Sequence, residues 1–292
     1  MRIALIFDAS RSDTTGVYFE RACHVLGVPC DHWWLRDAAQ IPADYDLYLR
    51  IDHGDDYTTA LPDSLRPLVF YAIDTHLPHS WPKIRRLARR YDLVCCAQAK
   101  AAGELRNAVW LPLACDPGRH CGESGPAVWD VAFVGTEGGV PRKFYLQVLR
   151  ERYPDSFIGA ADHRQLGSIY GRARIGFNYS IADDVNMRIF EVLAAKTLLV
   201  TNALTRDDLD RLGLQDRRHL ALYRRPSELI ETIEYFLTHE DARRRIAEAG
   251  HAAVLERHTY VHRMRQLLST ASQRLGLSMP IERAEVLTCA SS

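Results

Sequence analysis

Short apolar runs alternate with longer segments of helical period along most of the chain. The runs are rich in Val, Ile, Leu and Phe, which is typical of strands buried on both faces of a parallel sheet. The segments between them have the length and apolar spacing of crossover helices. This alternation predicts an α/β fold in which helices cover parallel sheets.

Two series of strands are expected, separated by a stretch without periodicity. The first series has strands near 3–7, 31–35, 47–51, 68–73, 93–96 and 109–111, with a helix over 15–26. The stretch 112–128 is dense in Pro, Gly and short polar residues, which is typical of a linker. The second series has strands near 130–134, 157, 175–178 and 198–201. We therefore predict two Rossmann-like domains, over 1–115 and 116–278.

The end of the second domain is expected to be helical. Ser227 is the expected cap of one helix, Gly250 the expected end of the next, and Thr259 the expected start of the last. Residues 279–292 are expected to form a loose tail.

Charge and hydropathy exclude some classes of partner. Lys plus Arg and Asp plus Glu both number 37, so the chain has no basic surplus for a nucleic acid or an anionic bilayer. No apolar run approaches the roughly 18 residues that span a membrane. The amino-terminal run MRIALIFDAS is too short for the apolar region of a signal peptide. We expect a cytoplasmic protein with neither a nucleic-acid partner nor a membrane span.

Polar residues that follow the strands are candidate site residues, because ligands of open parallel sheets bind beyond the carboxyl ends of the strands. For any one of these residues, turn chemistry or helix capping is the simpler explanation. The candidates used below are Asp8, Asp52, His53, Asp74 and His76 in the first domain and Gly135, Thr136, Asn178, Thr201 and Asn202 in the second.

The loop 135–139, Gly-Thr-Glu-Gly-Gly, joins a predicted strand to a predicted helix. Its backbone N–H groups and the following helix amino terminus would suit a phosphate. It lacks the G-x-G-x-x-G pattern, so a nicotinamide or flavin enzyme loses support. Arg142 and Lys143 open the next helix, where they would face a bound diphosphate or be solvated surface charges.

A second candidate cluster lies on the predicted helix that follows the strand at 175–178. Asp184, Arg188 and Glu191 stand at i, i+4 and i+7 and would share one face, as a ligand site or as exposed ion pairs. Glu191 lies between Phe190 and Val192, where a buried carboxylate needs a partner such as the hydroxyls of a ribose. Two D-x-D pairs, at 44–46 and 208–210, and twelve scattered histidines do not have the spacing of a metal site, so no metal is predicted.

Several motifs together resemble one family. The chain has N-x-R-x-F-E at 186–191 within DDVNMRIFEVLAAKTLLVTN, R-x-x-I-A-x-x-G at 243–250 and H-T-Y-x-x-R at 258–263. WLPLACDP at 110–117, DVAFVG at 130–135 and the run YGRARIGFNYS accompany them. In these features the chain resembles the CgeB-like branch of group-1 glycosyltransferases, most closely from Trp110 to Leu268.

The resemblance implies a GT-B fold with a cleft between two Rossmann-like domains and a donor bound mainly by the second. It also implies a UDP-, GDP- or TDP-linked sugar as co-substrate, no cofactor or catalytic metal, and transfer with retention. By position, Glu191 resembles the glutamate that holds the donor ribose, and Asp183 an acidic residue facing the sugar. His76 resembles a histidine that touches the transferred sugar.

The remaining donor-side roles are implied in the same way. Arg142, with Lys143 as second choice, would meet the diphosphate, and Arg188 with the loop at Gly135 would stabilise the leaving group. The other donor-side residues are Thr136, Asn178, Asn186, Thr201 and Asn202. Lys196 stands where relatives often have Gly.

Two other functions fit the same residues. A GT-B epimerase would use carboxylates or a histidine such as Asp74, His76 and Asp183. A non-catalytic nucleotide-sugar-binding partner protein would bind the donor without turnover. For a transferase the acceptor is open between a glycan, a protein, a lipid and a metabolite, with Asp8, Asp52, His53 and Asp74 expected on the acceptor side.

Overall fold

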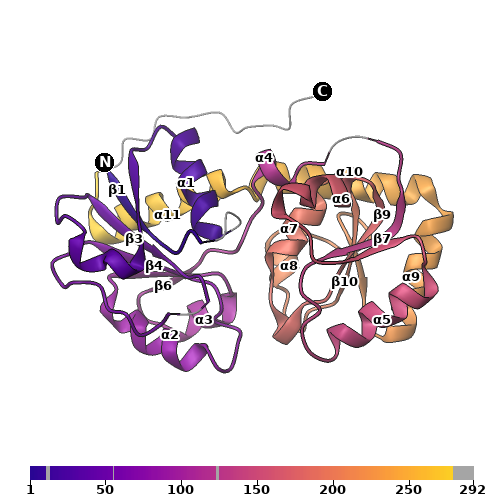
Figure 1. The fold of residues 1–292 in the computed structure, drawn as a ribbon, viewed down its shortest axis with the longest axis horizontal. Helices are drawn as coiled ribbons and strands as arrows, with labels where there is room; N and C mark the ends of the chain where they lie inside the picture. The colour runs from indigo at the N-terminus through magenta and orange to yellow at the C-terminus, as the bar shows by residue number, and fades with distance from the viewer. Residues whose placement is uncertain (11–13, 55, 123–124, 279–292) are drawn as a thin grey trace. The chain divides into compact units, whose positions relative to one another are not determined.

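The chain folds into two compact units. The computed structural model describes residues 1–10, 14–54, 56–122 and 125–278, so the expected tail lies outside the described residues. Unit 1 comprises Met1–Leu113 together with the described segment from Tyr260 onwards, and unit 2 comprises Ala114–Thr259. Each unit contains one sheet in which every strand pairing is parallel (Figure 1). The predicted α/β class with two parallel sheets is confirmed.

The sheet of unit 1 has six strands in the order β2-β1-β3-β4-β5-β6. They are β1 (Ile3–Ile6), β2 (Cys30–Trp33), β3 (Leu47–Ile51), β4 (Leu68–Ala72), β5 (Leu93–Cys96) and β6 (Ala108–Trp110). The helices are α1 (Thr15–Val25), α2 (Trp81–Leu87), α3 (Ala99–Glu104) and α11 (Tyr260–Leu275), with 3-10 turns η1 (Leu35–Gln40) and η2 (Ala88–Arg90). All six strands coincide with predicted strands to within a few residues.

Strand β4 shows how side chains are divided between the two faces of this sheet. Successive strand residues point to opposite faces. Phe70 and Ala72 belong to the core formed with η1, α2 and α3. Tyr71 packs on the other face against Phe19 of α1, with ring centroids 5.0 Å apart. An apolar run without polar alternation is therefore required, because both faces are covered.

Helix α11 packs in unit 1, whereas it was expected in the second domain. The ring of Tyr260 stacks on Tyr18 at 5.1 Å, and the fully buried Arg263 donates from Nε to Pro112 O at 2.8 Å. The aromatic and basic residues of the H-T-Y-x-x-R motif thus attach the last helix to the first unit. A linear division of the sequence at 115 does not represent this return of the chain.

The sheet of unit 2 has five strands in the order β11-β10-β9-β7-β8. They are β7 (Trp129–Val134), β8 (Ser156–Gly159), β9 (Ala173–Asn178), β10 (Leu198–Asn202) and β11 (Ala221–Tyr223). The helices and 3-10 turns are α4 (Pro117–His120), α5 (Arg142–Arg152), η3 (His163–Gln165), α6 (Leu166–Gly171), η4 (Ile181–Asp183), α7 (Met187–Ala194), α8 (Asp208–Arg211), α9 (Pro226–Thr238) and α10 (Glu240–Arg257). Strand β11 was not predicted.

The two faces of this sheet are covered by different helices. Helices α5, α9 and α10 contribute to a core with Phe133 and Phe177. Helix α7 approaches β9 closely at Gly176, where a Cβ would lie 2.4 Å from Val192 Cγ1. The close approach places the first turn of α7 beside the carboxyl end of β9.

Three local predictions differ from the structure. The boundary between the units, at 113–114, falls within the expected linker 112–128, but this stretch includes the buried residues Leu113, Cys115 and His120 and the helix α4. Helix α9 begins at Pro226 after Arg225, so Ser227 is not its cap. Helix α10 continues through Gly250 to Arg257. A Cβ at position 250 would lie 2.2 Å from His219 O, so the glycine is explained by close packing and not by helix termination. No helix within the described ranges is both long and apolar enough to cross a bilayer.

Candidate functional site

A buried hydrogen-bond network joins the carboxyl ends of β9 and β10. Asn178 Nδ2 donates to Thr201 Oγ1 at 3.0 Å, and the N–H of Ser180 donates to Asn202 Oδ1 at 2.7 Å. Asn178 and Thr201 are fully buried. The structure thus brings three predicted donor-side residues together, and their contacts hold the two strand ends to each other.

Arg188, in the first turn of α7, is oriented by this network. Its Nε donates to Val134 O at 3.0 Å, and its Nη1 donates to Asn178 Oδ1 at 3.2 Å. The guanidinium carbon lies 4.3 Å from the centre of the Phe133 ring. Gly135 follows β7 with φ +142°, and a Cβ there would lie 2.4 Å from Arg188 Nη2. Gly135 therefore gives both the backbone turn and the space that the guanidinium occupies.

Arg142, the first residue of α5, brings a second guanidinium to the same loop. Its Nε donates to Glu137 O at 3.0 Å, and a Cβ at Gly138 would lie 2.3 Å from its Nη2. Its guanidinium carbon is 5.8 Å from the centre of the Phe133 ring. Burial and the neighbouring Arg188 lower the pKa of Arg142. The carboxylate of Asp184 acts in the opposite direction and raises it. A negative charge beside the two guanidiniums would favour the charged form of both.

The rest of the loop is open to solvent. Thr136 and Lys143 are exposed, and Glu137 forms an ion pair with Arg150 at 2.6 Å. The structure therefore separates the two predicted cations at the start of α5. Arg142 points into the glycine loop, and Lys143 lies on the surface.

Glu191 lies one turn after Arg188 on α7 and is 8% exposed. His120 of α4 lies close to it, with Nε2 4.0 Å from Glu191 Oε1. The hydroxyl of Tyr170 accepts the N–H of Val134 at 3.0 Å beneath the glycine loop. Burial raises the pKa of Tyr170 to about 12. The mid-helix Glu191 is therefore set in a nearly buried polar environment, as its sequence position predicted.

Sequence reasoning missed His120 and Tyr170. His120 was hidden in the stretch interpreted as a linker, although a histidine four residues after the capping Asp116 is a recognisable turn pattern. Tyr170 is the first residue of the quoted run YGRARIGFNYS. Spacing alone does not reveal that its hydroxyl supports the strand before the loop.

Asp183 is engaged with the loop that follows β10. The N–H of Thr205 donates to Asp183 Oδ1 at 2.6 Å, and the hydroxyl of Thr205 bonds to its other oxygen. Ala182 and Asp183 both have left-handed backbone angles, with φ +52° and +66°. The carboxylate that was expected to face the sugar is held to Thr205 in this structure.

Asp184 is not on the helix with Arg188 and Glu191, because α7 begins at Met187 after its N-cap Asn186. Asp184 is buried, and burial raises its pKa to about 7. A hydrogen bond from the Asn186 side chain opposes this shift. The charge of Arg188 opposes it as well. Asn186 therefore contacts Asp184 just before α7 begins.

In unit 1, both carboxylate oxygens of Asp52 accept hydrogen bonds from the protein itself. Its Oδ1 accepts the N–H of Gly54 at 2.9 Å. Its Oδ2 accepts the N–H of Ile73 at 2.9 Å, the N–H of Asp74 at 3.2 Å and the hydroxyl of Tyr57 at 3.2 Å. The side chain joins the ends of β3 and β4 and is directed inward.

Four other predicted residues of unit 1 lie at the same carboxyl edge. Asp8 accepts the N–H of Ser10 at 2.7 Å, which lowers its pKa, and His53 lies close enough to lower it further. The Asp74 carboxylate is next to Gly54, where a Cβ would lie 3.2 Å from Asp74 Oδ2. Burial lowers the pKa of His76 to about 4, so its imidazole is neutral at neutral pH.

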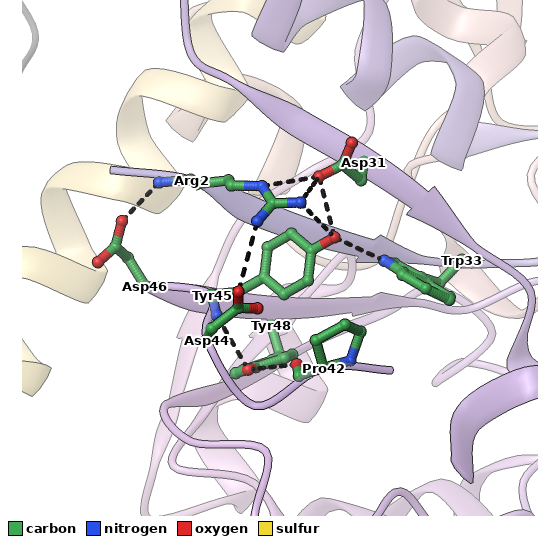
Figure 2. A network of polar contacts seen from close by, with 8 residues as sticks. All are labelled: Arg2, Asp31, Trp33, Pro42, Asp44, Tyr45, Asp46 and Tyr48. Atoms are coloured by element: carbon green, nitrogen blue, oxygen red, sulfur yellow. Dashed lines mark hydrogen bonds and ion pairs between the residues drawn. The ribbon is translucent and has the colours of Figure 1, made fainter. Parts of the chain in front are cut away.

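Figure 2 shows what the first D-x-D pair does. Asp46 accepts the backbone N–H of Arg2 at 2.6 Å, and Asp44 lies 3.7 Å from the Arg2 guanidinium. Tyr45 between them donates to Asp31, which itself pairs with Arg2 at 2.7 Å. This network lies at the amino ends of β1, β2 and β3, opposite to the edge where ligands bind. The network therefore stabilises the sheet and does not form a ligand site.

The second D-x-D pair has a similar explanation. Asp208 is buried and paired with Arg206 at 3.3 Å and Arg211 at 3.1 Å. Within the described ranges, no group of three or more His, Cys, Asp or Glu side chains is placed to hold a metal ion.

Comparisons with known proteins agree with this geometry. Residues 125–269, which contain the glycine loop, both arginines and Glu191, match the family described as glycosyl transferase-like. A search of curated proteins gave no match.

Solved structures resemble the chain over nearly its whole length. HepE of Anabaena in complex with UDP and glucose is 14% identical, with a TM-score of 0.68, covering 94% of this chain and 100% of that one. The phage T4 enzyme BGT in complex with UDP-glucose is 13% identical, with a TM-score of 0.63 and coverage of 95% and 100%. An alpha-glucosyltransferase in complex with UDP-glucose and DNA containing an abasic site is 10% identical, with a TM-score of 0.68 and coverage of 93% and 99%.

At these identities the structural likeness establishes the fold, and the family match concerns the unit that carries the paired arginines. The family resemblance drawn from the sequence motifs is thereby confirmed. Residues 125–269 match the glycosyl transferase-like family, and the chain is a glycosyltransferase of the GT-B fold.

Proposed function

We propose that unit 2 binds a nucleotide-sugar donor through its diphosphate, held by Arg142, Arg188 and the loop 135–139. The observation that carries this proposal is the pair of guanidiniums beside one Phe133 ring. The described hydrogen bonds of both guanidiniums go to neutral carbonyl oxygens. The buried Asp184 is near enough to raise the pKa of Arg142, and Arg188 lowers the pKa of Asp184. One carboxylate does not balance two guanidiniums, and a diphosphate would supply further negative charge.

Glu191 binds the donor ribose in this proposal. It lies on the same helix as Arg188, one turn further on, so a diphosphate at the arginines brings the attached ribose toward it. A carboxylate accepts hydrogen bonds from two vicinal hydroxyls, which suits a ribose. The nearly complete burial of Glu191 makes such donors energetically important.

The reaction is electrostatic catalysis of leaving-group departure. Negative charge grows on the diphosphate as its bond to the anomeric carbon breaks, and the two guanidiniums stabilise that charge. We propose that they do so without a divalent metal and that transfer proceeds with retention, as the family resemblance implies. We also propose, from the family resemblance alone, that His76 touches the transferred sugar.

The first donor to test is UDP-glucose, because the structurally similar proteins were captured with UDP, glucose or UDP-glucose. We propose that the acceptor is not a nucleic acid, although one neighbour was captured with DNA, because the formal charge of zero gives no basic surplus. A cytoplasmic glycan, protein, lipid or metabolite acceptor follows.

Calorimetric titration of UDP, GDP, TDP and their sugars in EDTA tests the donor site. We expect one nucleotide to bind, and Glu191→Ala to weaken it by roughly tenfold or more, as loss of hydrogen bonds to a charged group does. Glu234→Ala is the matched control, since that exposed carboxylate on α9 pairs with Arg152. If no nucleotide binds, or if folded Glu191→Ala binds equally well, the assignment is wrong.

Product analysis with donor alone separates the competing activities. A transferase gives slow hydrolysis, an epimerase gives an isomeric nucleotide sugar, and a binding protein leaves the donor intact. Only the first outcome agrees with the proposal.

A further inference from the structure

His120 is a completely buried histidine whose tautomer is set by the backbone. The N–H of Asp116 donates to His120 Nδ1 at 3.0 Å. Nδ1 therefore carries the lone pair, and the proton of the neutral ring is on Nε2. This nitrogen is the one that lies 4.0 Å from Glu191 Oε1. The nitrogen that carries the proton is thus the one nearer to the carboxylate assigned to the ribose of the nucleotide sugar.

The short helix that carries His120 is seated firmly within unit 2. Asp116 caps it by accepting the N–H of Gly118 at 3.1 Å, and the N–H of Cys115 donates to His258 O at 3.0 Å. A Cβ on Gly167 of α6 would lie 2.6 Å from Cys121 O, and one on Gly122 would lie 2.7 Å from Gly167 O. Glycines at these two positions let the backbone after α4 approach α6 closely, which fixes the position of α4 and of His120.

We propose that His120 is a positioning residue for Glu191 and that its Nε2–H holds one carboxylate oxygen so that the other faces the ribose. The inference rests on the proposed donor site. A distance of 4.0 Å is longer than a hydrogen bond, and such bonds commonly tighten when a ligand binds. Because the His120 ring is neutral, its Nε2–H orients Glu191 without cancelling the negative charge that attracts the ribose hydroxyls.

Two substitutions separate orientation of Glu191 from support of the turn. In His120→Asn, the amide oxygen can replace Nδ1 as acceptor for Asp116, but no donor reaches Glu191. In His120→Gln, the longer side chain replaces the Nε2 donor and loses the acceptor. His219→Asn is the matched control, because His219 Nδ1 accepts the N–H of Gln215 at 3.1 Å in the same i, i+4 arrangement.

Donor affinity and the steady-state constants are the measurements. We expect His120→Asn to raise the donor Kd and KM by roughly tenfold with a much smaller change in kcat, and His120→Gln to stay within about threefold of wild type. His219→Asn should leave both constants unchanged. In a Glu191→Gln background, His120→Asn should have little further effect, because the two groups act through one contact. Equal effects of Asn and Gln, or full additivity with Glu191→Gln, would overturn the proposal.

A measurement on the unmutated ring covers the case in which His120→Asn does not fold. Nitrogen-15 NMR of labelled histidine should show His120 protonated at Nε2, with that signal shifting when nucleotide is added to wild type and not to Glu191→Gln. A proton on Nδ1, or an unchanged signal at saturating nucleotide, contradicts the proposal. If Glu191→Gln itself binds donor normally, the proposed ribose site fails, which is a different result.

Discussion

Polar side chains lie at the carboxyl edges of both sheets, but their hydrogen bonds differ between the two units. In unit 1, Asp52 accepts four hydrogen bonds from the protein and joins two strands. In unit 2, Arg142 and Arg188 lie beside one ring and donate their hydrogen bonds to neutral acceptors. Position after a strand therefore identifies candidates, and the hydrogen bonds and charges of each residue separate a structural role, as for Asp52, from the binding role proposed for the two arginines.

The largest expected effect comes from removing a guanidinium. Arg188→Gln should lower kcat/KM for the donor by roughly 10²–10³, because an interaction with the growing charge of the leaving group is lost. Steady-state kinetics with the identified donor, and a thermal melt to verify folding, give the measurement. Arg174→Gln is the control, since that half-exposed arginine pairs with Asp130. Activity within tenfold of wild type in Arg188→Gln would place the diphosphate elsewhere.

The reverse result is expected at the edge of unit 1. Asp52→Asn should lower the free energy of unfolding by about 3 kcal/mol. The amide N–H₂ group of asparagine would face backbone N–H groups whose hydrogen bonds the carboxylate accepts in wild type. Urea denaturation measures this change. Asp74→Asn should lower the free energy of unfolding much less. Loss of turnover in Asp52→Asn at unchanged stability would show that the carboxylate serves the acceptor after all.

The two edges should also respond oppositely to pH. Asp184, with its pKa raised to about 7, keeps a proton in the folded state that the unfolded chain has lost. Its contribution to stability is therefore present at low pH and disappears as the pH rises through 7, by about 2 kcal/mol between pH 5 and pH 7. Urea denaturation across this range should show the slope in wild type and a flatter one in Asp184→Asn. An unchanged slope in the variant would contradict the assignment.

His76 should change the stability with pH in the opposite direction to Asp184. Its pKa is lowered to about 4, so the folded state binds fewer protons than the unfolded chain between pH 4 and about 6.5. The contribution of neutral His76 is present above that range and is lost as the pH falls through it. His76→Gln should reduce the loss of stability on acidification, which acid titration of the unfolding midpoint can detect. A steeper acid loss in the variant would refute this.

The smallest expected effect concerns Lys196, which has a left-handed φ of +60° where glycine is favoured. Lys196→Gly should raise the free energy of unfolding by up to about 1 kcal/mol through relief of this conformation. Loss of the exposed ion pair with Glu248 at 3.2 Å offsets part of the gain. Lys196→Ala removes the ion pair and keeps the strain, so a melting temperature as high as that of the glycine variant would disprove the backbone explanation.

The sequence predicted every strand except β11. The signal was clearest for β3, β4 and β5, because these strands are buried along their whole length and their apolar runs are nearly continuous. It failed where tertiary contacts decide: Gly250 fits under His219 O instead of ending α10, and α11 returns to unit 1 through Tyr260 and Arg263. In the site, the family motifs and spacing indicated Arg142, Arg188 and Glu191. The spacing of Asp116 and His120 indicates a turn, but it does not indicate the role that we propose for His120, because that role depends on which ring nitrogen accepts the N–H of Asp116.

The return of α11 also affects the order in which the molecule can be completed during synthesis. The aromatic contacts of Tyr260 with Tyr18 and Phe19, and the bond from Arg263 to Pro112, close the core of unit 1 only when the last helix has been made. The whole of unit 2 is translated before that helix leaves the ribosome. The unit that is encoded first is therefore finished last, and a fragment that stops at Leu113 exposes the aromatic face that α11 covers.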